Sequence, residues 1–95
     1  MGRLNGRVSV ITGAASGIGR SAALRFAEEG AIVVVVDVDG SGAAETVTLA
    51  ERTGATACWF TSDVTDSADV DRIASEVHQR FGSLDILMTA AAVSV

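Results

Sequence analysis

Residues 12–19 run Thr12-Gly13-Ala14-Ala15-Ser16-Gly17-Ile18-Gly19, and this stretch decides the fold of the 95-residue chain. An apolar run at 8–11 precedes it and a helical pattern follows it. Glycines at this spacing allow a sharp turn and a close approach of the backbone to a ligand, because they carry no β-carbon. The following helix presents unpaired N–H groups, which favour an anion such as a diphosphate. The stretch therefore predicts a strand, a phosphate-binding loop and a helix in succession.

Outward from this loop, the hydrophobic pattern alternates between strands and helices. It predicts strands at about 7–12, 31–36, 56–60 and 84–88, and helices at about 16–29, 43–52 and 67–81. In the first helix, the apolar face is predicted to hold Ile18, Ala22, Ala23, Phe26 and Ala27. Such alternation implies right-handed crossovers and a parallel sheet. The predicted fold is α/β, a Rossmann-like sheet of four strands in order 3-2-1-4 with three helices, which is an incomplete doubly wound fold.

The composition excludes several classes of protein. A net charge of −5 without a basic cluster argues against nucleic-acid binding, which needs cations to neutralise phosphates. The apolar runs, such as 31–36, are far shorter than the about 20 residues of a membrane span. The single cysteine, Cys58, permits no intramolecular disulfide. We therefore expect a cytoplasmic protein without nucleic-acid or membrane partners.

An acidic residue completes the phosphate-binding pattern. Asp37 follows the second predicted strand, close to the spacing of about 20 residues expected of a ribose ligand. Its carboxylate would accept hydrogen bonds from ribose hydroxyls and repel a 2′-phosphate, and Val38 supplies no cation. These features predict a dinucleotide site that prefers NAD over NADP. The alternative is that Asp37 only caps a turn together with Asp39.

Several motifs together resemble the short-chain dehydrogenase/reductase family. The loop at 12–19 matches that family's Thr-Gly-x-x-x-Gly-x-Gly motif, Asp37 matches its acidic position for NAD, and Asp63-Val64 matches its adenine-binding pair. The resemblance implies an NAD-dependent oxidoreductase that acts on an alcohol or carbonyl substrate. It also implies a set of cofactor-binding residues: Gly13, Ser16, Gly17, Ile18, Gly19, Asp37, Asp63 and Val64. Ser16 also suits the N-cap of the helix, a role compatible with binding the anion.

The chain departs from the family pattern at two places. Residues 89–92 are Thr-Ala-Ala-Ala where the family has Asn-Asn-Ala-Gly, and the family's catalytic Ser, Tyr and Lys correspond to positions beyond 95. The 95 residues hold no tyrosine and no lysine, so no catalytic residue is assigned. We expect residues 1–95 to form a truncated NAD-binding domain that is inactive alone. The alternative is a non-catalytic nucleotide-binding or interaction module that pairs with a full-length relative through exposed sheet or helix surface, as a homo- or hetero-oligomer.

The remaining polar and reactive side chains favour structural roles. His78 is predicted to be solvated on the third helix, and Cys58 to lie buried in a strand beside a packing Trp59. The acidic residues of the third helix suit its N-terminus and exposed face better than a metal site: Asp66, Asp69, Asp71 and Glu76. No metal site is therefore predicted.

Overall fold

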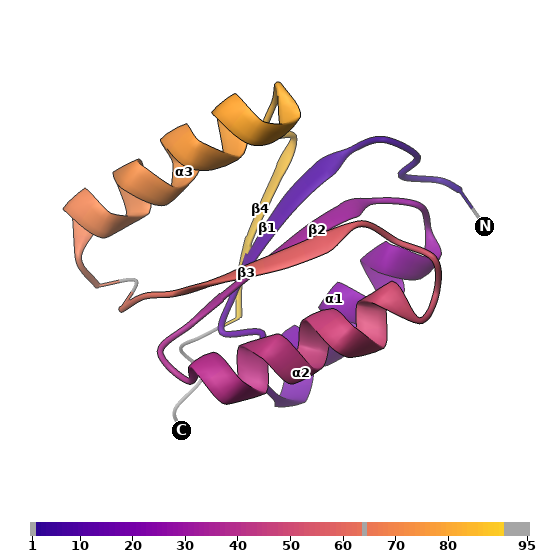
Figure 1. The fold of residues 1–95 in the computed structure, drawn as a ribbon, viewed down its shortest axis with the longest axis horizontal. Coiled ribbons are helices and arrows are strands. Elements are labelled where there is room, and N and C mark those ends of the chain that lie inside the picture. Colours follow the sequence, from indigo (N-terminus) through magenta and orange to yellow (C-terminus); the bar gives the residue numbers. More distant parts are fainter. Residues whose placement is uncertain (1, 64, 91–95) are drawn as a thin grey trace.

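The computed structural model describes residues 2–63 and 65–90, in which four strands alternate with three helices (Figure 1). The strands are β1 (Val8–Thr12), β2 (Ile32–Asp37), β3 (Ala57–Thr61) and β4 (Ile86–Thr89). The helices are α1 (Gly17–Glu28), α2 (Gly40–Glu51) and α3 (Ser67–Phe81). The sheet is parallel with strand order β3-β2-β1-β4, which confirms the predicted fold class and topology.

The helices cover both faces of the sheet, with α1 and α2 on one side and α3 on the other (Figure 1). Strands β1 and β2 are buried almost throughout, as expected of central parallel strands covered on both faces. Alternate residues of these strands supply two separate cores. The core under α1 and α2 includes Ile11, Val33 and Val35 with Ala23 and Val47, and the core under α3 includes Val10, Val34 and Val36 with Ile73 and Val77.

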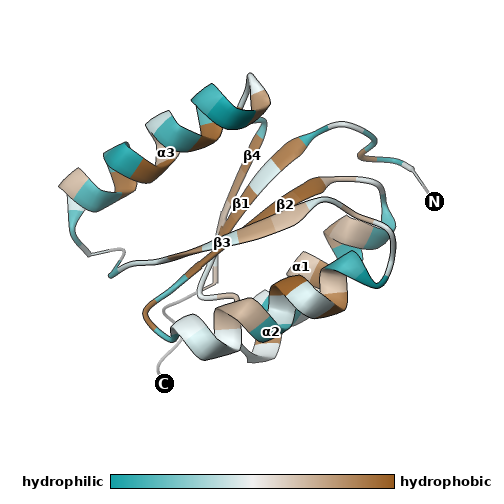
Figure 2. Ribbon diagram, in the orientation of Figure 1, coloured by the Kyte–Doolittle hydropathy of each residue, from teal (hydrophilic) through white to brown (hydrophobic). Residues whose placement is uncertain are grey.

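The hydropathy of the chain follows these layers (Figure 2). The strands are mostly hydrophobic, whereas α3 alternates between hydrophobic positions and strongly hydrophilic ones. Only Ile73 and Val77 are buried among the residues of α3. This helix is therefore held to the sheet by a narrow apolar stripe, which the half-buried Phe81 extends.

The strand register brings the ends of three strands to one edge of the sheet. Thr12 of β1 lies opposite Val36 of β2, and Asp37 lies opposite Thr61 of β3. The segments that follow these strands therefore begin side by side. Ligands of open α/β sheets bind at this carboxyl edge.

Helix α3 has the predicted bounds because both of its ends carry strong signals. The Asp66 side chain accepts hydrogen bonds from the N–H groups of Ala68 and Asp69 at the N-terminus. Gly82 ends the helix in the left-handed conformation, with φ of 84°. The capping residues Asp66 and Gly82 thus mark the two ends of α3.

Helix α2 corrects the prediction, since it begins at Gly40 and not at 43. Asp39 is its N-cap, and the carboxylate of Asp39 accepts the N–H of Gly42 at 3.0 Å. This cap draws the predicted turn residues Gly40, Ser41 and Gly42 into the first helical turn. Strand β4 also begins later than predicted, at Ile86, and the other boundaries shift by about one residue.

Candidate functional site

The glycine-rich loop joins the end of β1 to the start of α1. The N–H of Gly13 donates to the carbonyl of Val36 at 2.8 Å, so the loop begins against the end of β2. Gly13 and Gly17 have φ of 73° and 59°, in the left-handed region that side chains disfavour. Open space surrounds the missing β-carbon of Gly17, with no atom within 4 Å. The backbone here is both tightly turned and accessible.

Gly19 has a different function within the same motif. It is fully enclosed in the first turn of α1, and a β-carbon there would collide with the carbonyl oxygen of Gly13. The absence of a side chain thus lets α1 pack directly on its own loop. This is the close helix–loop packing that the third glycine of such a motif provides.

The N-terminus of α1 presents open hydrogen-bond donors. Ser16 is the N-cap residue with extended backbone, but its side chain makes no capping hydrogen bond, and the first turn has no acidic residue. Ser16, Gly17 and Ile18 are all exposed. The first N–H groups of the helix and its positive dipole end are therefore available to an anion.

Ile18 corrects a sequence prediction. Its side chain is 69% exposed and does not join the core, whereas Gly19, Ala23 and Ala27 are the buried residues of α1. Ala23 and Ala27 lie in the core and Phe26 packs against it, as predicted, so the predicted apolar face is wrong at Ile18, in the first turn. An exposed isoleucine beside the open N-terminus offers apolar surface at the candidate site.

Asp37 joins the loop to the end of β2. Its Oδ2 accepts a hydrogen bond from the N–H of Ala15 at 3.0 Å, and its Oδ1 accepts from the N–H of Asp39 at 3.0 Å. The second bond is the turn cap that the sequence left open as an alternative. Each carboxylate oxygen has two lone pairs, and both therefore retain capacity for ribose hydroxyls.

The segment after β3 completes this edge of the sheet. The N–H of Ser62 donates to the carbonyl of Asp37 at 3.0 Å, which places Ser62 and Asp63 beside the end of β2. Asp63 is exposed, and its Oδ1 accepts from the N–H and the hydroxyl of Thr65. The N–H of Thr65 is the main cause of a lowered pKa of Asp63, so this carboxylate is ionised at neutral pH. Val64, the other predicted adenine residue, lies outside the described residues.

Three residues that the sequence analysis did not assign also contact the loop. Arg20 bonds to the carbonyl of Ala15, and the Thr46 hydroxyl bonds to the carbonyl of Ala14. A β-carbon on Gly42 would lie 2.8 Å from Cβ of Ala15, so α2 packs tightly on the loop. No local pattern marks Thr46 or Gly42, because their contacts with the loop span about 30 residues of sequence.

Thr89 and Ala90 stand where the resembled family has two asparagines, and the described part of the sheet is intact there. Thr89 lies opposite Thr12 in the register, and the N–H of Ala90 donates to the carbonyl of Thr12 at 3.0 Å. At the other end of this pair, Val8 and Asp85 exchange two hydrogen bonds, of 2.8 and 2.9 Å. Backbone pairing thus holds β4 to β1 without the family's asparagine amides. The Thr12 hydroxyl, however, is buried and has no hydrogen-bond partner among the described residues.

The other residues named in the sequence analysis differ in how far they are exposed. His78 is exposed on α3, Cys58 is half-buried and not fully buried as predicted, and Trp59 is 45% exposed on β3. Burial raises the pKa of the Cys58 thiol, so it stays protonated at neutral pH. Across residues 2–63 and 65–90, no group of three His, Cys, Asp or Glu side chains is arranged to hold a metal ion.

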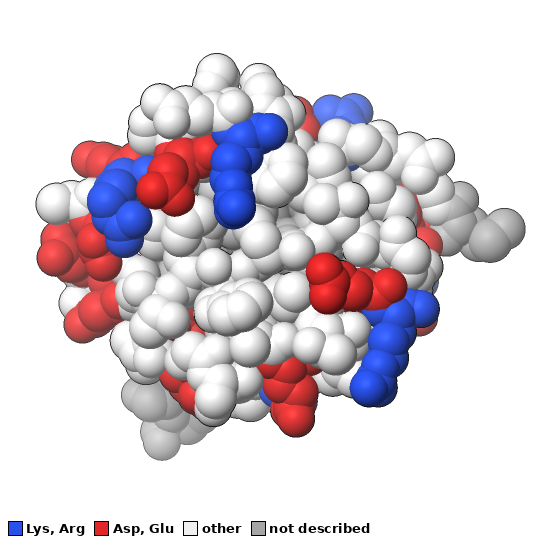
Figure 3. All heavy atoms as spheres, in the orientation of Figure 1, with Lys and Arg blue, Asp and Glu red and all other residues white. Residues whose placement is uncertain are grey.

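Charged side chains avoid the centre of one face of the molecule (Figure 3). On that face they gather over α3 and around α2, and the middle, over β3, is largely uncharged. Trp59, on β3, contributes exposed apolar surface. Within the described part of the chain, no helix combines the length and apolar character needed to cross a membrane.

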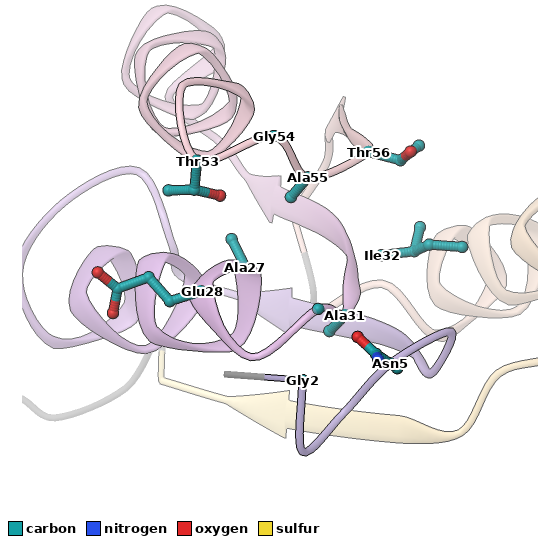
Figure 4. Close-up of a pocket in the computed structure, with 11 residues that line it drawn as sticks. Gly2, Asn5, Ala27, Glu28, Ala31, Ile32, Thr53, Gly54, Ala55 and Thr56 are labelled. Carbon is teal, nitrogen blue, oxygen red and sulfur yellow. The ribbon is translucent and has the colours of Figure 1, made fainter.

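A cavity of about 280 Å³ lies at the opposite end of the sheet from the glycine-rich loop (Figure 4). It is bounded by the segments that precede β1, β2 and β3, and its lining includes Asn5, Ala27, Ala31, Thr53 and Thr56. The lining consists mostly of small side chains and backbone. The predicted dinucleotide residues that the structure describes lie at the other edge.

Comparison with known proteins agrees with this geometry. Residues 7–95 match the family described as short chain dehydrogenase. The chain is 43% identical over 91 residues to sorbitol dehydrogenase of Cereibacter sphaeroides, and 44% identical over 91 residues to galactitol 2-dehydrogenase of Agrobacterium fabrum. Each match covers 96% of this chain and 34% of the relative. The chain therefore spans about a third of the length of these curated relatives.

A solved structure gives the same result in three dimensions. The crystal structure of a short chain dehydrogenase from Mycobacterium paratuberculosis bound to NAD superposes with a TM-score of 0.92 at 33% identity. The match covers 99% of this chain and 40% of that chain. The arrangement of strands, helices and loop described above is thus present in a protein that holds NAD.

Proposed function

The chain belongs to the short-chain dehydrogenase family, and on that premise we propose that it is the NAD-binding part of an oxidoreductase. The whole protein would act on an alcohol or carbonyl substrate, and the bound cofactor would accept a hydride from the alcohol as NAD or donate one to the carbonyl as NADH. The observation that carries the proposal is the hydrogen bond from the N–H of Ala15 to Asp37. It joins a candidate ribose ligand to the loop whose next residues present open donors.

Each predicted residue has a proposed role at this edge of the sheet. The backbone from Gly13 to Gly19, with Ser16 and Ile18, would bind the diphosphate, since the turn is tight and the first N–H groups of α1 are open. Asp37 would accept hydrogen bonds from the adenosine ribose. Asp63 and Val64 would contact the adenine. In this proposal, the carboxylate of Asp37 also disfavours the 2′-phosphate of NADP, by like-charge repulsion.

The chain itself would bind and orient the cofactor, and would not carry out proton transfer. A short-chain dehydrogenase uses a tyrosine with a nearby lysine to exchange a proton with the substrate oxygen. These 95 residues contain neither type of residue. We propose that residues 1–95 act as a dinucleotide-binding domain without activity of their own.

Calorimetric titration of the purified chain tests this proposal. ADP-ribose and NAD should bind with dissociation constants no more than about tenfold apart, because the proposed contacts involve only the adenosine and diphosphate. NADP should bind more weakly than NAD. Binding of neither ADP-ribose nor NAD would contradict the proposal, as would a clear preference for NADP.

A further inference from the structure

One arginine connects the glycine-rich loop to α2. Nη2 of Arg20 donates to the carbonyls of Ala15 at 2.6 Å and of Gly42 at 3.2 Å. Its Nε donates to Oγ1 of Thr46 at 2.9 Å, and its Nη1 lies 2.7 Å from a carboxylate oxygen of Glu45. We call this set of contacts, from Arg20 to Ala15, Gly42, Glu45 and Thr46, the Arg20 bridge. It takes up four of the five N–H donors of the guanidinium.

The Arg20 bridge also determines the direction of the hydrogen bonds of the Thr46 hydroxyl. Thr46 is fully buried, and because its oxygen accepts from Arg20, its single hydroxyl hydrogen is left to donate. The carbonyl of Ala14 is the nearest acceptor, at 2.7 Å, and that of Gly42 lies at 3.1 Å. The carbonyls of both Ala14 and Ala15 are therefore within hydrogen-bond reach of this cluster.

The peptide groups of the loop are thus fixed from two sides. Arg20 holds the carbonyl of Ala15 on one side, while Asp37 holds the N–H of Ala15 on the other. Carbonyl oxygens carry partial negative charge and would oppose a bound diphosphate if they turned toward it. Hydrogen bonds within the fold keep these two carbonyls occupied.

We propose that Arg20 is a positioning residue of the dinucleotide site, acting through the carbonyls of Ala14 and Ala15 without touching the ligand. Its side chain is only 24% exposed, and the ion pair with the more exposed Glu45 offsets its charge. Arg20 also fixes the spacing between the loop and α2. A planar guanidinium can reach these acceptors at once, whereas a lysine ammonium is a single point charge. The inference rests on the proposed function.

Titration of the labelled chain with ADP-ribose, followed by NMR, tests this role with matched controls. Arg20→Met should weaken ADP-ribose binding by about tenfold, and Arg20→Lys should recover only part of that loss. Arg25→Met removes the same charge from an exposed position of the same helix, and Val77→Ala weakens the core on the opposite face. Both controls should change the dissociation constant by less than about twofold, at a temperature where all variants are folded.

A second readout needs no ligand. Hydrogen exchange at the N–H of Ala15 should accelerate in Arg20→Met and stay unchanged in Arg25→Met, because only the first loosens the loop. If the unmodified chain does not bind ADP-ribose, the proposed function is contradicted. If it binds and Arg20→Met binds equally tightly, or Arg20→Lys restores full affinity, the positioning role alone is overturned. Unchanged exchange at Ala15 in Arg20→Met would also overturn it.

Discussion

The carboxylate of Asp37 accepts the N–H of Ala15 at 3.0 Å, across 22 residues of sequence. This bond joins the end of β2 to the middle of the glycine-rich loop. The same carboxylate accepts the N–H of Asp39, so one side chain organises two turns at the carboxyl edge of the sheet. A substitution at Asp37 should therefore affect both ligand selection and loop geometry.

Asp37→Asn should narrow the preference for NAD over NADP by about tenfold. The amide keeps much of the shape of the carboxylate but loses the negative charge that would repel a 2′-phosphate. Dissociation constants for both dinucleotides, measured by calorimetry, give the ratio. Asp71→Asn makes the same charge change on the exposed side of α3 and should leave the ratio unchanged. An unaltered ratio in Asp37→Asn would remove Asp37 from the ribose site.

Gly19→Ala should lower the free energy of unfolding by about 1–3 kcal/mol and abolish detectable ADP-ribose binding. The new methyl group would meet backbone atoms of Gly13 and Ala14, which cannot move without displacing the loop. Gly40→Ala is the matched control, since its methyl group would meet mainly the side chain of Thr61, which can rotate. Urea unfolding and the ADP-ribose titration measure the two effects. If both variants have the same free energy of unfolding and the same affinity for ADP-ribose, the close packing of Gly19 on Gly13 contributes to neither.

The chain should lose stability as the pH falls below about 5. The pKa of Asp85 is lowered chiefly by the N–H of Val8, and that of Asp69 chiefly by the Ser62 hydroxyl. Because both pKa values are lower in the folded state, the stabilisation is complete above the unfolded pKa of about 3.9 and is lost as protons bind below it.

Urea midpoints measured at several pH values between about 2 and 6 test this expectation. Asp85→Asn should flatten the pH dependence, since one of the groups with a lowered pKa is then absent. A urea midpoint that stays constant over this range in the unmodified chain would contradict the assigned hydrogen bonds.

Ile73→Ala should cost about 2–5 kcal/mol of unfolding free energy. Ile73 is 3% exposed and is one of the two buried residues that hold α3 on the sheet. Ile18→Ala makes the same change at a 69% exposed position and should alter stability by no more than about 0.5 kcal/mol. Thermal and urea unfolding compare the two variants. A similar loss for both would mean that α3 is not packed as described.

Local residue chemistry explains how much of the fold was predictable from sequence. The glycine-rich segment at 12–19 and the aspartate-containing segment at 61–66 are strong local signals. The β-branched run that contains Val33 to Val36 is typical of a strand covered on both faces. The start of α2 was missed because Gly40 and Gly42 favour turns in isolation. Only the cap by Asp39 makes them helical.

The candidate site was predictable where the signal lies within one motif. Gly13, Gly17 and Gly19 follow from spacing, and the location of Asp37 follows from the end of its strand. The contacts of Arg20 and Thr46 with the loop depend on how α1 and α2 pack together, which no local pattern encodes. The direction of Ile18 was wrong for a related reason: Gly19, and not Ile18, is enclosed against Gly13 in the first turn of α1, a contact that hydrophobic spacing does not encode.

An NMR titration with ADP-ribose, mapped residue by residue, tests the central claim most directly. The account predicts that the amide signals of Gly13 to Gly19, Asp37 and Asp63 move together along one binding curve. Signals of the exposed face of α3, such as those of Asp71 and His78, should stay in place. Movement centred on α3 or on the cavity beside Asn5, with the glycine-rich loop unaffected, would contradict the account.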